Sequence, residues 1–526
     1  MITRTARTLW ILGLVVCATV ACASVAWTQA PSNDWTEASP ASLGMDSELL
    51  DLMISVIDES APSVDGLVVA RHGQIALEHY PSPNGYDEGD MHILYSVTKS
   101  VTSILVGIAI DQGFIGGVDD LVVDYFPDLE IANLDSRKAR MTVEDLLTMT
   151  SGLAWEGPDD MHHSWGQAVL SRNPVQYTLN QPMSHEPGEH FLYNGGCSHL
   201  LSAIISRATG MSTRVFARDY LFWPLGIQSF YWPVDPTGVY YGGQDIRLSP
   251  RDLAKLGQLY LDGGLWNGER IVSEAWVNRS SQPLVNQSTT DYGYGYQWWV
   301  LPEGTIYQAW GALDQHLFVV PDLDLVVAVT SDNQVPNQAQ GELREGILLG
   351  DWLLSRFVMP ACDEYEPNAF SDHSVQVRFP RATALRVRDL NSNESATLSS
   401  GLIKAYHPYS PFDMARVQWY ESSSNESQTA LADYVQYLLQ AWGSMAESTG
   451  SLGTAEVRGH TASLTGYRVE IPGLAIHEGV IAAWFCDETE RQFVATYGEE
   501  GLQAPSTLLD PTEGLNDFLA TLDCHP

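Results

Sequence analysis

Basic residues are scarce in this sequence. Lys and Arg together number 27 against 65 Asp and Glu, which gives a formal net charge of −38 over 526 residues. A nucleic-acid partner is therefore not expected, because phosphate binding needs clustered Lys and Arg. The acidity instead favours solubility, as in salty or extracellular surroundings.

Long apolar runs are also absent after residue 30. No segment there is nearly as long as the about 18 consecutive apolar residues that a transmembrane helix needs. The N-terminus differs, because Arg4 and Arg7 precede an apolar stretch at 9–20 that ends in small residues. This pattern predicts a signal peptide over 1–30, cleaved after Ala23 or Ala30. The alternative is an uncleaved membrane anchor. Either one predicts a secreted, periplasmic or cell-surface protein whose membrane contact is limited to that anchor.

Cysteine is sparse, and four cysteines follow the N-terminal segment: Cys197, Cys362, Cys486 and Cys524. Export permits disulfides. Since three of the four lie in the last third of the chain, one bridge among those three is expected, with its pairing left open. Cys197 is then expected as a buried thiol.

Metal-binding spacings are missing too. His162 and His163 follow two aspartates, and His185 and His190 lie nearby, but no H-E-x-x-H or paired-cysteine spacing accompanies them. These residues are therefore interpreted as loop histidines. The sequence predicts no metal and no cofactor.

The apolar patterns predict a sheet made in two separate parts of the chain. Strands at 66–70 and 74–79 flank a His72-Gly73 turn, and later strands are expected at 294–300, 305–310, 316–320 and 325–330. A helix is predicted at 46–58, and helices and loops dominate 118–250. We therefore expect an α+β fold with a mainly antiparallel sheet, flanking helices and an all-helical insertion.

The chain is long enough for more than one domain. After residues 1–30, a first domain is expected over 31–360, and an acidic, proline-containing linker over 361–371. Residues 372–526 then predict a small α+β accessory domain of unknown role. Its helices are expected at 429–445 and 513–522.

The most informative stretch for chemistry is LYSVTKSVTSILVGIAIDQG at 94–113. Its apolar residues recur at helical spacing, so Ser96 and Lys99 lie three positions apart on one helix face. Serine is a weak nucleophile that needs an adjacent base, and a lysine buried on an apolar helix can supply one after losing its proton. An S-x-x-K motif alone is weak, because it also occurs by chance at helix starts.

Further segments join this motif in order along the chain. The sequence resembles the serine β-lactamase and penicillin-binding-protein superfamily, in its class C–related branch of family VIII carboxylesterases, D-amino-acid peptidases and nylon-oligomer hydrolases. The resemblance covers about 40–358 and is carried by these segments: HGQIALEHY at 72–80, the 94–113 stretch, MTVEDLLTMTSGLAWEG at 141–157, PGEHFLYNGGCSHLLSAII at 187–205, and AWGALDQHLFVVPDLDLVVAVTS at 309–331.

The resemblance implies a β-lactamase/transpeptidase-like fold and an acyl-enzyme mechanism. Ser96 matches the nucleophile, and Lys99 and Tyr193 match the pair that transfers its proton. The oxyanion would be bound by the backbone N–H groups of Ser96 and Ala312.

This sequence departs from the family pattern in three places. Trp310-Gly311-Ala312 stands where lactamases and carboxypeptidases usually carry Lys-Thr-Gly, whose lysine binds a substrate carboxylate. Gly195 replaces the usual asparagine two positions after the tyrosine, so Asn194 is the candidate for its orienting role. Asp314 occupies a position where glycine is common. Asn194, Trp310 and Gly311 are therefore candidate substrate-binding residues.

Together these features predict an exported serine hydrolase that cleaves a small carboxylic ester, amide or short peptide. A D-stereospecific peptidase or amidase and a β-lactamase-type activity are the enzymatic alternatives. An alternative of another class is a catalytically idle regulator that binds peptidoglycan or a peptide. The intact set of Ser96, Lys99 and Tyr193 favours an enzyme.

Overall fold

A computed structural model describes residues 35–60, 63–81, 85–157, 162–286, 292–301, 306–331, 350 and 353–363, and then mainly strands between 368 and 501. The predicted signal or anchor at 1–30 lies outside these described residues. Among the described residues, none of the helices has the length and apolar character needed to cross a membrane.

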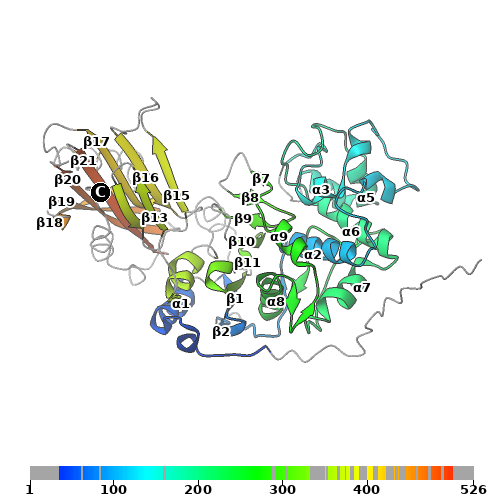
Figure 1. Cartoon of the computed structure of the whole chain (residues 1–526), viewed down its shortest axis with the longest axis horizontal. Helices are drawn as coiled ribbons and strands as arrows, with labels where there is room; N and C mark the ends of the chain where they lie inside the picture. The colour runs from blue at the N-terminus through cyan, green and yellow to red at the C-terminus, as the bar shows by residue number, and fades with distance from the viewer. Residues whose placement is uncertain are drawn as a thin grey trace, which may run out of the picture.

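The first sheet has eight strands in the order β2-β1-β12-β11-β10-β9-β8-β7 (Figure 1). Every neighbouring pair is antiparallel. The early hairpin thus pairs with a late strand, which confirms the predicted antiparallel sheet built from two parts of the chain. The strands are β1 (Val64–Arg71), β2 (Gln74–His79), β7 (Val285–Asn286), β8 (Gly293–Tyr294), β9 (Trp299–Val300), β10 (Tyr307–Gly311), β11 (Gln315–Val320) and β12 (Leu325–Ser331).

Turn chemistry explains why the first hairpin was predicted well. His72 and Gly73 both have left-handed backbone conformations, with φ of 52° and 71°, between the paired residues Arg71 and Gln74. Two such residues form the tight turn that matches the twist of antiparallel strands. By contrast, the predicted single strand at 294–300 is wrong. Gln297 has a φ of 64°, and the chain reverses there to form the separate strands β8 and β9.

Helices cover both faces of this sheet. One face packs against α2 (Val97–Asp111) and α8 (Pro250–Leu261), and the other packs against α1 (Ser47–Ser60). The residues of α2 from Val97 to Ala109 are all buried. A helix that is apolar around most of its circumference is stable only when its neighbours exclude water on all sides, and this fixes α2 in the centre of the domain.

The central part of the chain is helical, as predicted, and its helices begin at polar caps. At α3, the Thr142 side chain accepts from Asp145 N–H and Asp145 accepts from Thr142 N–H, which forms a capping box. At α8, Ser249 accepts from Asp252 N–H and Pro250 occupies the first turn. The other helices are α4 (Ser164–Leu170), α5 (Pro174–Leu179), α6 (Gly195–Thr209), α7 (Thr213–Ala217) and α9 (Glu274–Ser280), and α3 spans Val143–Leu147.

The C-terminal part contains a second antiparallel sheet, in the order β15-β16-β17-β21-β20-β19-β18. Figure 1 shows these long strands grouped apart from the first sheet. Ala430, Ala432 and Gln436 are helical within the predicted helix at 429–445, and the predicted helix at 513–522 lies outside the described residues. The strands are β15 (Ala384–Asp389), β16 (Ser400–Tyr406), β17 (Asp413–Glu421), β18 (Ala446–Val457), β19 (His460–Ile471), β20 (Ala475–Cys486) and β21 (Arg491–Gly501).

The structure excludes one cysteine, Cys362, from the predicted disulfide bridge. Cys197, Cys362 and Cys486 are buried. Cys362 is a thiol whose Sγ donates to Val358 O at 3.5 Å, and burial raises its pKa to about 11. Cys362 therefore has no part in the predicted bridge. Cys524 lies outside the described residues.

Candidate active site

Ser96 occupies the position just before the first residue of α2, after a left-handed residue, Tyr95, whose φ is 43°. A neighbouring strand-like segment holds this bend. Leu94 N–H donates to Ile246 O at 2.9 Å, and Ile246 N–H donates to Thr98 Oγ1 at 3.1 Å. Unfavourable backbone conformations persist only where the surroundings impose them. The segment 242–248 therefore holds the bend at Tyr95, and so fixes the orientation of Ser96 at the start of α2.

Lys99 lies directly beside Ser96. Its Nζ donates to Ser96 Oγ at 3.0 Å and to Gly243 O at 2.9 Å, and only 2% of the residue is exposed. An ammonium group in this position donates to the hydroxyl, whereas the neutral amine would accept the hydroxyl proton. Because burial disfavours the charged form, this environment is suited to a lysine that exchanges protons.

Tyr193 completes the set of three predicted catalytic residues. Its ring lies under Lys99 Nζ, 4.6 Å from the ring centroid, and stacks on Trp299 at a centroid distance of 5.7 Å. The ring face attracts the ammonium form, which opposes the effect of burial on Lys99. The structure thus brings Ser96, Lys99 and Tyr193 together.

The end of β10 approaches the start of α2. A Cβ added at Gly311 would lie 2.4 Å from Leu94 O, so this position requires glycine. Ala312 follows and is exposed. It begins a loop in which Leu313 and Asp314 both have left-handed conformations, with φ of 63° and 62°. Close approach of a glycine-containing strand edge to Ser96 is compatible with the predicted oxyanion-binding role of this loop.

Trp310 lies on the other face of the same strand. It is paired with His316 across β10 and β11, and side chains alternate between faces along a strand. Since Ala309 and Leu317 belong to the core around α2, the Trp310 ring lies on the face opposite α2. It contacts Trp299 at 5.6 Å and connects with Tyr193 through that ring.

Asn194 has a structural position. Only 1% of it is exposed, and its Oδ1 accepts from Cys197 N–H at 3.3 Å at the start of α6. Its side chain therefore caps the helix that follows Tyr193. Capping fixes the entry of the chain into α6, and so places Tyr193 relative to Lys99.

Two features of the site were not found from the sequence. Gly242 O accepts from Thr102 Oγ1 at 2.8 Å, and Gly243 O accepts from Lys99, so both glycines serve α2 through their carbonyls. Gln297, 1% exposed, donates through Nε2 to Leu146 O and accepts from Ser198 Oγ. The Gly-Gly pair was the available signal for the first feature.

Asp245 is the acidic residue whose charge acts on Lys99. Burial raises the pKa of its carboxyl, and the attraction of Lys99 and Arg247 opposes that rise. Asp245 itself has a left-handed φ of 70°. The lysine thus has a partly buried counter-charge close to the nucleophile.

The four histidines lie in loops, as predicted: His162, His163, His185 and His190. His185 and His190 stack on one another with ring centroids 4.2 Å apart. Within the described residues, no group of three or more His, Cys, Asp or Glu side chains is arranged to hold a metal ion.

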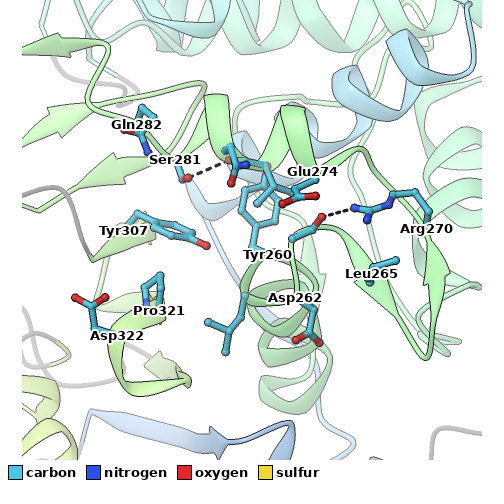
Figure 2. A pocket seen from close by; sticks show the side chains of 14 residues that line it. Tyr260, Asp262, Leu265, Arg270, Glu274, Ser281, Gln282, Tyr307, Pro321 and Asp322 are labelled. Carbon is cyan, nitrogen blue, oxygen red and sulfur yellow. Dashed lines mark hydrogen bonds between the residues drawn. The ribbon is translucent and has the colours of Figure 1, made fainter. Parts of the chain in front are cut away.

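A cavity of about 520 Å³ lies elsewhere, between the end of α8, the helix α9 and the β11–β12 turn (Figure 2). None of the predicted catalytic residues lines it. Its walls carry Asp262, Arg270, Glu274, Tyr307 and Asp322. This cavity therefore does not coincide with the group formed by Ser96, Lys99 and Tyr193.

Comparison with known proteins gives concordant results. The model of the Beta-lactamase family matches residues 58–351. The 6-aminohexanoate-dimer hydrolase of Paenarthrobacter ureafaciens is 25% identical over 307 residues, covering 54% of this chain and 77% of that protein. Penicillin-binding protein 4* of Bacillus subtilis (strain 168) is 25% identical over 285 residues, covering 45% of this chain and 59% of that protein.

Solved structures include EstCE1, described as a hydrolase with promiscuous acyltransferase activity. It aligns with a TM-score of 0.46 at 18% identity, covering 56% of this chain and 94% of that chain. The family match ends at residue 351, before the strands of the second sheet.

Proposed function

Because the chain belongs to the beta-lactamase family, which includes hydrolases among its relatives, we propose that it is a serine hydrolase that forms an acyl-enzyme on Ser96. One observation carries the proposal. The buried Lys99 Nζ lies 3.0 Å from Ser96 Oγ and 4.6 Å from the centre of the Tyr193 ring. A nucleophile, a base within hydrogen-bond reach and a third group that orients the base are the parts such a reaction needs.

In the proposed reaction Ser96 Oγ attacks a carbonyl carbon and its proton passes to Lys99 and Tyr193. The negative charge on the carbonyl oxygen is stabilised by backbone N–H groups of Ser96 and of the loop that begins at Ala312. The same proton then goes to the leaving oxygen or nitrogen, whose bond to carbon breaks. Water hydrolyses the acyl-enzyme by the reverse sequence of proton transfers.

The substrate is proposed to be a neutral carboxylic ester first and an amide second. Trp310, whose ring lies on the sheet face opposite α2, replaces the lysine that would bind a substrate carboxylate. The acidic chain, at −38, also disfavours an anionic ligand. Export is proposed from Arg4, Arg7 and the apolar stretch that follows them.

Short-chain p-nitrophenyl esters test the proposal with purified protein, using Ser96→Ala beside the wild type. The wild type should turn over these esters, and Ser96→Ala should not. Ser42→Ala, which changes an exposed serine distant from Ser96 in the sequence, should keep full activity. Identical rates for wild type and Ser96→Ala would refute the hydrolase and favour the idle regulator. D-amino-acid amides and nitrocefin assayed in parallel distinguish amidase and lactamase activities.

A further inference from the structure

Three polar side chains lie next to one another beside the loop that follows β10, and the proposed reaction does not use them. They are Gln308 on β10 and His316 on β11, both 0% exposed, and Asp314 in the loop. His316 Nδ1 lies 2.8 Å from Gln308 Oε1. Polar groups buried inside a sheet layer need partners, because each unpaired group costs stability.

The other side of the His316 ring faces a carboxylate. Its Nε2 lies 3.7 Å from Asp314 Oδ1, beyond hydrogen-bond length, and neither atom has a hydrogen-bond partner among the described residues. Aromatic rings fix the imidazole in this direction. Phe318 stacks on it at 4.9 Å with an interplanar angle of 5°, and Trp310 stacks at 6.2 Å with an angle of 8°.

The His316 ring connects its two polar neighbours. Its Nδ1 is directed at the Gln308 side-chain amide, and its Nε2 is directed at the Asp314 carboxylate. Among the described residues, Asp314 is the ionisable group that faces the ring, and Gly350 lies against its edge.

The loop that carries Asp314 is strained and needs to be held. Leu313 and Asp314 are consecutive non-glycine residues in the left-handed region, with φ of 63° and 62°. Gln315 ties the loop to the neighbouring strand, because its Nε2 donates to Leu313 O at 2.9 Å and to Ser331 O at 2.6 Å. The Asp314–His316 contact is a second, independent tie on the same loop.

We propose that His316 and Asp314 form a positioning pair that holds the Ala312–Asp314 loop where its backbone N–H groups reach the oxyanion. The inference rests on the proposed function. Neither residue touches the reacting atoms. Removing the pair should lower kcat while leaving KM nearly unchanged, because the loop acts on the transition state more than on the bound substrate.

The test compares Asp314→Asn, His316→Gln and the double variant in ester turnover and in the second-order rate of fluorophosphonate labelling. Each single variant is expected to lose about tenfold in kcat and in labelling rate, less than the about 10²–10³ of a deleted oxyanion donor. The double variant should be no worse than the worse single variant, because one interaction is lost in all three.

A matched control exists on the same sheet. His72 Nδ1 lies 2.8 Å from Asp324 Oδ2, and both side chains are about half exposed. Asp324, like Asp314, is left-handed in a turn beside β11. His72→Gln and Asp324→Asn should therefore keep wild-type kcat and labelling rate, whereas an equal loss in these controls would overturn the proposal.

The outcomes distinguish failure of the proposed function from failure of the positioning pair. A wild type that neither labels nor turns over would refute the proposed function. A wild type that labels while Asp314→Asn labels at the same rate would refute the positioning pair alone. Asp314 is partly exposed, so this variant provides the result even if the buried His316→Gln fails to fold. Losses that multiply in the double variant would also overturn the pair.

Discussion

The surroundings of Ser96 and the cavity in Figure 2 differ in the chemistry they can support. At Ser96 a buried amine touches the hydroxyl at 3.0 Å, and an aromatic ring covers that amine. The cavity is about 520 Å³ in volume, but its serine, Ser281, donates to Val277 O at 2.9 Å. The Ser281 hydroxyl proton is thus directed at a backbone carbonyl, which cannot act as the base that a serine nucleophile needs.

The ionisable groups differ in the same way. Arg270 in the cavity donates to Gly263 O and Val272 O, and Tyr260 is a buried phenol whose pKa burial raises to about 12. The Tyr260 phenol therefore keeps its proton at neutral pH. Around Ser96, in contrast, Lys99 is subject to opposing influences from burial, the Tyr193 ring and the Asp245 carboxylate. Active sites are places where burial and neighbouring charges act together on one ionisable group.

The largest effect after loss of Ser96 itself is expected at Lys99. Lys99→Met keeps most of the side-chain volume but removes the amine that is proposed to accept the Ser96 proton. We expect kcat/KM for esters to fall by about 10²–10⁴, the usual contribution of general acid–base catalysis. Circular dichroism should show an unchanged fold. Activity within threefold of wild type would remove Lys99 from the mechanism.

A smaller loss is expected from Tyr193→Phe. This variant keeps the ring that lies under Lys99 and stacks on Trp299, but it removes the hydroxyl. A fall in kcat of about 10²-fold would indicate proton transfer through the phenol. If kcat does not change, the ring acts only as a support for Lys99, and the proton must pass through the lysine alone.

Asp245→Asn should change stability in a pH-dependent way. Burial raises the pKa of this carboxyl, so the folded state resists its ionisation and loses stability as pH rises above about 4. Asparagine tolerates the left-handed backbone and carries no charge. The variant should therefore melt at a higher temperature than wild type at pH 7, and this difference should vanish near pH 3. A pH-independent difference between the two proteins would contradict this explanation.

The smallest effect is expected in the cavity. Ser281→Ala removes a hydroxyl bonded to the helix backbone at a cost of about 1 kcal/mol in unfolding free energy. Ester turnover should stay within twofold of wild type. Ser281→Ala therefore serves as a control for Ser96→Ala at a second buried serine. A loss of activity as large as that of Ser96→Ala would indicate that the catalytic site lies in the cavity.

Local chemistry accounts for the parts of the site that the sequence predicted. Ser96 and Lys99 were placed together by helical spacing, and the turn at His72 and Gly73 followed from residue preferences. Each of these depends on residues within a few positions of one another. The sequence pattern was therefore sufficient there.

Non-local contacts account for what was missed. Gly243 accepts from Lys99 across 144 positions of the chain, and Gln297 reaches α3 across 150. The face on which Trp310 lies depends on strand register relative to α2, which alternation alone does not fix. The turn at Gln297 was not predicted, because an aromatic-rich stretch favours a continuous strand.

Fluorophosphonate labelling followed by peptide mass mapping tests the central claim most directly. A serine activated by Lys99 should react once per chain, and the added mass should map to the peptide that contains Ser96. The label should be absent from Ser96→Ala and present in Ser281→Ala. No labelling of the wild type, or labelling that maps to Ser281 or another serine, would contradict the account.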